Sequence, residues 1–155
     1  NLYFSVNQGK VMHYDLVAKT ASLIKEYSVV NRLFLRHGYL WICRLWDDII
    51  CYDLKTNEER VISMEGKDQS EFSNSYVTDL TSKDNLTFYL TTWNGLYKLR
   101  FDNESLCKSP FVLTLLTKNE KAFHSSIENK MTSLFWDDKQ QILWVGTFGG
   151  GGREI

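Results

Sequence analysis

A short aromatic-rich pattern occurs four times in this chain, and this repeat limits the fold more than any other feature of the sequence. The clearest copy reads "ILWVGTFGGG" at 142–151. The other copies are "NLYFSVNQGKVMHYDL" at 1–16, "YLWICRLWDDIICYDL" at 39–54 and "TFYLTTWNGL" at 87–96. Copies about 40 to 55 residues apart are typical of four-stranded propeller blades, and this spacing is too long for leucine-rich or ankyrin repeats.

Further signals place the strands within each unit. An element of the form V-[NT]-x-L, or M-T-S-L in the last unit, stands at 30–33, 77–80 and 131–134. Alternating runs close the units, and Pro110 precedes one of them, where an outer edge strand tolerates a missing hydrogen-bond donor. We therefore predict an all-β fold of four-stranded antiparallel β-propeller blades, as a fragment of a larger propeller. The expected units are a partial blade at 1–28, blades at 29–75 and 76–129, and a partial blade at 130–155.

The composition agrees with this fold and narrows the partners. Aromatic residues make up 14% of the 155 residues, which favours pleated strands, and no sustained helical periodicity is visible. A net charge of −1 gives no reason to expect nucleic acid as a partner. No apolar run approaches the roughly 20 residues that cross a bilayer, so we expect membrane attachment only through a longer parent chain. Unpaired strand edges favour association, which predicts either further blades or a homodimer.

The cysteines and glycines give no sign of a metal or cofactor site. Cys43, Cys51 and Cys107 form no CxxC pair and no zinc-type cluster. We expect them to be small buried hydrophobic residues, with a cross-strand disulfide between Cys43 and Cys51 as the alternative. The glycines at 149–152 lack the Lys-Ser/Thr of a phosphate-binding loop, so they predict a hairpin turn. We expect no metal and no cofactor.

The repeat resembles a known family at the residues just described. "MTSLFWDDKQQILWVGTFGGG" at 131–151 and "VTDLTSKDNLTFYLTTWNGLYKL" at 77–99 resemble the two-component regulator propeller repeat. That repeat builds the periplasmic sensor region of hybrid two-component systems in Bacteroides-type bacteria. The unit at 30–54 departs from it, because Cys43-Arg44 replaces the usual Gly-Thr, and the opening copy has Ser5-Val6 there.

The resemblance implies a role and a location. It implies a fragment of a sensor histidine kinase's periplasmic region, non-catalytic itself, that senses oligosaccharides or another small ligand on the outer side of a bacterial inner membrane. No kinase or DNA-binding motif occurs in this chain. Two alternatives stay open: a protein-interaction propeller scaffold, or part of a propeller-fold lyase or glycosidase.

The candidate ligand site lies at the turns between the second and third strands of successive units. These turns should share one face of a propeller, and their aromatic and polar side chains suit a sugar. The ring faces pack on its C–H surface and the polar groups bond its hydroxyls. Trp46 is the first candidate, because its neighbours break the chemistry usual in the repeat. The predicted ligand-binding residues are Arg44, Trp46, Asp47, Trp93, Asn94 and Phe148.

Other reactive groups have a simpler interpretation. The anchors Trp41, Tyr89 and Trp144 should pack in the core between blades. The carboxylate pairs at 47–48 and 137–138 belong to the chemical class used in glycoside hydrolysis, but both fall in predicted turns, where Asp bonds its own backbone. The histidines His13, His37 and His124 form no metal or catalytic motif, so we predict no catalytic residue.

Overall fold

The protein is all-β wherever its structure is described. The computed structural model describes residues 1–6, 9–45, 48–63, 77–93, 95–117 and 130–149, together with the backbone of 151–154. Every regular element in these ranges is a β-strand, which confirms the predicted fold class. The polar stretches at 65–75 and 117–129, whose composition predicts loops between blades, lie outside the described residues apart from Thr117.

The strands form four separate antiparallel sheets, each built from consecutive strands. The first sheet contains β1 (Leu2–Val6), β2 (Lys10–Asp15) and β3 (Thr20–Glu26). The second contains β4 (Val30–Arg36), β5 (Tyr39–Arg44), β6 (Ile49–Asp53) and β7 (Glu59–Ile62). The third contains β8 (Val77–Ser82), β9 (Thr87–Thr92), β10 (Gly95–Phe101) and β11 (Phe111–Leu115). The fourth contains β12 (Met131–Asp137), β13 (Ile142–Thr147) and β14 (Gly151–Glu154).

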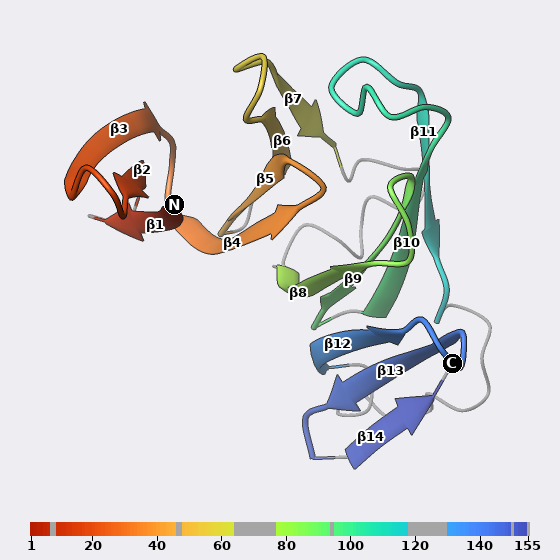
Figure 1. The fold of residues 1–155 in the computed structure, drawn as a ribbon. Helices are drawn as coiled ribbons and strands as arrows, with labels where there is room; N and C mark the ends of the chain where they lie inside the picture. The colour runs from red at the N-terminus through yellow and green to blue at the C-terminus, as the bar shows by residue number, and fades with distance from the viewer. Residues whose placement is uncertain are drawn as a thin grey trace.

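The sheets follow one another in chain order along an arc, which is the arrangement of propeller blades (Figure 1). Strands β4, β8 and β12 lie on the inside of the arc, where β8 contacts both β4 and β12, while β7 and β11 lie on the outside. Strand β5 is buried on both faces, because a sheet in the middle of the arc has a neighbour on each side. Proline 110 directly precedes the edge strand β11, as predicted.

The V-[NT]-x-L element recurs because it forms a β-bulge in the first strand of a sheet. In the second, third and fourth sheets the register of the first strand shifts just after the Val or Met, so that one residue is left out of the pairing. In two of these sheets that extra residue bonds the next sheet. The Asn31 side chain donates to the Val77 carbonyl (3.1 Å), and the Thr78 hydroxyl donates to the Met131 carbonyl (2.7 Å). The bulge residue therefore joins the second sheet to the third and the third sheet to the fourth.

Aromatic residues fill the spaces between the sheets. Trp41 is fully buried against Phe88 and Phe101, with ring centroids 4.6 and 6.1 Å apart. Within the described part of the chain its indole nitrogen has no hydrogen-bond partner, so packing is what holds it there. Tyr89, at the equivalent register position, stacks on Trp136 at 5.9 Å.

The prediction that Trp144 is a core residue is wrong for this structure. Trp144 occupies the register position of Trp41, but 40% of its surface is exposed, and its cross-strand partner Phe135 is 62% exposed. The reason is its place in the array, because no further described sheet covers this face. Tyr89 is intermediate, as its neighbour sheet covers it only in part.

Candidate functional site

The predicted site lies at one end of the sheets, where the second strand of each sheet turns into the third. In the third sheet Thr92 pairs with Gly95, which leaves a two-residue turn at 93–94. Gly95 has φ +143°, and a Cβ there would lie 2.4 Å from the Thr117 hydroxyl, so this position requires glycine. The glycine-rich stretch is also a hairpin connection, as predicted. However, Gly151 and Gly152 pair within β14, and the turn is confined to 148–150.

Two of the predicted aromatic residues meet the same lysine. Trp93 is 43% exposed, and the Lys130 ammonium lies 5.1 Å from the centroid of its ring. The backbone N–H of Phe148 donates to the Lys130 carbonyl (2.8 Å), and Phe148 is 65% exposed. Turn residues of the third and fourth sheets therefore both contact Lys130, Trp93 through its ring and Phe148 through its backbone N–H. The sequence analysis missed Lys130, and its only signal was its place just before the M-T-S-L element.

Arg44 has a different environment. Its Nε donates to the Asp48 carbonyl at 3.3 Å, and one terminal nitrogen donates to the Ser28 hydroxyl at 3.4 Å. The guanidinium therefore closes its own turn in the second sheet and is half-buried. The other predicted residues, Trp46, Asp47 and Asn94, lie outside the described residues, so the site is described in part.

The opposite end of the sheets carries a repeated carboxylate arrangement. At each of four turns one Asp accepts hydrogen bonds from two backbone N–H groups two and three residues later. These residues are Asp15, Asp53, Asp84 and Asp137. The bonds lower the pKa of the Asp15 carboxyl. The predicted turn role of the 137–138 pair is thus what the structure shows, and Asp138 accepts from the Trp136 indole (2.8 Å).

A groove of about 270 Å³ also lies at this opposite end. Its walls come from the second and third sheets and include His37, Tyr39, Asn85 and Glu104. These groups are bonded to their surroundings: His37 to the Ser82 hydroxyl (2.8 Å), and Asn85 to the Glu104 carboxylate (3.1 Å). Of these two bonds, the one between His37 and Ser82 connects the second and third sheets.

The cysteines are reduced and do not form the alternative cross-strand pair. Cys43 lies opposite Ile49, and Cys51 lies opposite Trp41, so the register separates the two. Cys43 and Cys51 are buried, as predicted, whereas Cys107 is only half-buried. Among the described residues no group of His, Cys, Asp or Glu is arranged to hold a metal ion. Nor does any helix there have the length and apolarity to cross a membrane.

The described geometry can be compared with known proteins. No family model matches the sequence, and no curated protein matches it significantly. The structure is similar to the extracellular domain of BT4673 from B. thetaiotaomicron, whose two structures are described as a one-component and a hybrid two-component system. In the first, 16% of residues are identical, 99% of this chain and 21% of that chain are covered, and the TM-score is 0.67. This chain therefore spans about a fifth of that domain.

Two other structures share the fold. The computationally designed Ika4 protein is 18% identical, with 98% of this chain and 86% of that chain covered and a TM-score of 0.61. The extracellular domain of the hybrid two-component system BT3049 from B. thetaiotaomicron is 14% identical, with 99% and 24% covered and a TM-score of 0.51. At such low identity the likeness shows the fold alone. The chain thus has the β-propeller fold found in extracellular domains of B. thetaiotaomicron two-component systems.

Proposed function

We propose that this chain belongs to the ligand-sensing region of a hybrid two-component regulator, on the periplasmic side of a bacterial inner membrane, and that its ligand is a carbohydrate. The single observation that carries this proposal is a pair of exposed aromatic side chains, Trp93 and Phe148, at the turns of two successive sheets. Both residues contact Lys130, Trp93 through its ring and Phe148 through its backbone N–H. The structural likeness to extracellular domains of such regulators supports the cellular context.

The chemistry of this end suits a sugar. Exposed aromatic faces pack well on the C–H surface of a pyranose ring, and an ammonium group can donate to its hydroxyls. Arg44 contributes a fixed positive charge in the neighbouring sheet. We include Trp46, Asp47 and Asn94 in the proposed site as residues of the same turns. Pairing of two copies and attachment to a membrane through a parent chain remain predictions.

The alternative functions have less support. A glycosidase or lyase needs acid and base groups that converge on one substrate, whereas four Asp side chains of the described residues each bond two N–H groups of their own turn. A protein-interaction scaffold would be supported by a broad exposed apolar patch at one end of the propeller. The exposed pair Phe135 and Trp144 instead lies on the face of a sheet.

Thermal unfolding in the presence of oligosaccharides tests the proposal. A glycan at about 100 times its Kd should raise the Tm of the purified chain by roughly 5–10 °C, because it binds the folded state only. Trp93→Ala should abolish this shift. Trp144→Ala is the matched control, since Trp144 is exposed to a similar degree (40% against 43%) but lies away from the turns. No shift with any broad glycan class, or an equal loss in both variants, would contradict the proposal.

A further inference from the structure

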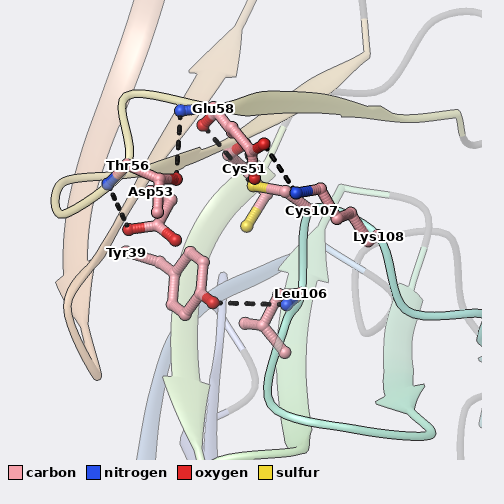
Figure 2. Close-up of polar contacts among 8 residues, drawn as sticks. All are labelled: Tyr39, Cys51, Asp53, Thr56, Glu58, Leu106, Cys107 and Lys108. Carbon is pink, nitrogen blue, oxygen red and sulfur yellow. Dashed lines mark hydrogen bonds and ion pairs between the residues drawn. The ribbon is translucent and has the colours of Figure 1, made fainter.

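The loop at 102–110, between β10 and β11, is fixed against the second sheet. The Tyr39 hydroxyl donates to the Glu104 carbonyl (2.7 Å) and accepts from the Leu106 N–H (3.3 Å). Lys108 forms an ion pair with Glu58 (2.6 Å). Figure 2 shows the bond between Tyr39 and Leu106 and the ion pair between Lys108 and Glu58. The loop therefore has a defined position relative to the second sheet.

Two cysteines meet inside this contact. Cys107 comes from the loop and Cys51 from β6, and each thiol influences the pKa of the other. The Cys107 sulfur also lies 3.5 Å from the Cys51 carbonyl and 3.5 Å from the Glu58 carbonyl. Figure 2 shows the two side chains side by side between the second sheet and the loop. Disulfides need Cα atoms roughly 4–7 Å apart, and a Cys107 sulfur 3.5 Å from the Cys51 carbonyl is compatible with that range.

We propose that Cys51 and Cys107 are a disulfide site that links the second and third sheets covalently. The third cysteine is excluded, because Cys43 lies opposite Ile49 on the neighbouring strand and has no place in the loop contact. The inference is independent of the ligand site. A periplasmic location, which belongs to the proposed function, would supply the oxidising environment.

The reaction with a low-molecular-weight disulfide balances as two exchanges. The Cys107 thiolate, which is the less buried of the two, attacks oxidised glutathione, forms a mixed disulfide and releases one glutathione thiolate. Cys51 then attacks the Cys107 sulfur as a thiolate, forms the protein disulfide and releases the second glutathione. Each thiol proton ends on a released glutathione. Burial raises the pKa of both thiols, so the exchange should be slow at neutral pH and faster as the pH rises.

The linkage can be read directly by peptide mapping. Trypsin places the cysteines in three separate peptides: HGYLWICR (37–44) carries Cys43, LWDDIICYDLK (45–55) carries Cys51, and FDNESLCK (101–108) carries Cys107. The purified native chain is incubated with oxidised glutathione at pH 8.5, its remaining thiols are alkylated, and it is then denatured, alkylated again and digested. We expect 45–55 joined to 101–108, and 37–44 recovered alone and alkylated.

Variants and stability complete the test. Cys107→Ala and Cys51→Ala should each abolish the linked peptide, while Cys43→Ala should retain it. The bond joins residues 56 apart in sequence, and oxidation should raise the Tm of the chain by roughly 5–15 °C, reversibly with dithiothreitol. The proposal is overturned if the native chain keeps both thiols free after prolonged oxidation, or if the linked peptides contain Cys43. Because no glycan is present, this result is separate from the outcome of the ligand screen.

Discussion

The interface between the second and third sheets and the open face of the fourth sheet carry the same residue pattern in different surroundings. Trp41 pairs across the strands with Phe34, and Trp144 pairs with Phe135. In the interface Trp41 is fully buried against two phenylalanines of the third sheet. On the open face Trp144 and Phe135 are 40% and 62% exposed. Burial of the repeated aromatic residue therefore depends on its place in the array.

The polar contacts between sheets follow the same rule. Asp79, the residue after the bulge in the third sheet, accepts from the backbone N–H groups of Leu134 in the fourth sheet (2.7 Å) and of Leu80 (2.8 Å). Ser133 is at the equivalent position in the fourth sheet. No next sheet follows it in the described part of the chain. This repeat position therefore bonds between sheets only where a neighbouring sheet supplies a partner.

The largest expected effect comes from the two tryptophans. Trp41→Ala should lower the free energy of unfolding by about 3–5 kcal/mol, because it leaves a cavity in a closed interface. Trp144→Ala should lower it by less than about 1 kcal/mol, since much of the side chain is already in water. Urea unfolding followed by circular dichroism measures both. Equal losses would mean that the two faces are equally covered.

The second effect concerns the carboxylate between the third and fourth sheets. Asp79→Ala should cost about 2 kcal/mol, because two backbone N–H groups lose a charged acceptor. Asp79→Asn retains one acceptor oxygen and should cost about half as much. The matched change Ser133→Ala should stay within about 0.5 kcal/mol. Unfolding midpoints in urea compare the three variants, and a Ser133 variant as unstable as Asp79→Ala would break the comparison.

The smallest effect concerns the interface between the first and second sheets. This interface is stabilised partly by an ion pair. Glu59 in β7 pairs with Lys25 (2.5 Å) and accepts from the Tyr27 hydroxyl (2.9 Å), both at the first sheet's outer end. Partial burial opposes ionisation, but these two bonds lower the pKa of the Glu59 carboxyl below its ordinary value of 4.5. The stabilisation is therefore complete above that value and is lost as the pH falls through the lowered pKa.

Hydrogen exchange of the first sheet against pH measures this loss. Below pH 4.5, exchange of β3 amides should rise more than exchange of β9 amides. The difference in opening free energy should be less than about 1 kcal/mol, because the Lys25–Glu59 pair is partly exposed. In Glu59→Gln the difference should be present already at pH 7 and should not change with pH. A wild-type β3 whose protection is independent of pH would show that the ion pair adds nothing.

Much of the fold could be predicted from the sequence, because the repeat is local and each copy supports the others. The V-[NT]-x-L element marked the first strand of three sheets, and the anchor aromatic marked the second. Exposure of Trp144 could not be predicted, since it depends on what covers a face and not on the residue. The proximity of Cys107 to Cys51 also left no local signal, because a long loop brings together residues from different repeats.

The candidate site was less predictable for a related reason. The turns that carry it differ in length between sheets, so equivalent residues cannot be assigned by alignment alone. Trp93 and Phe148 were found because an aromatic residue follows the second strand in three of the four units. Lys130 was missed because it belongs to a connection, where the repeat has no pattern.

The central claim is that one blade-like sheet recurs and that its neighbours decide which aromatic anchors are buried. Fluorine NMR of the chain labelled with 5-fluorotryptophan, assigned by single substitutions in a dilute sample, tests it directly. The account predicts a Trp41 resonance that does not change between H₂O and D₂O and a Trp144 resonance that shifts as an exposed indole does. Equal solvent sensitivity of the two resonances would contradict it.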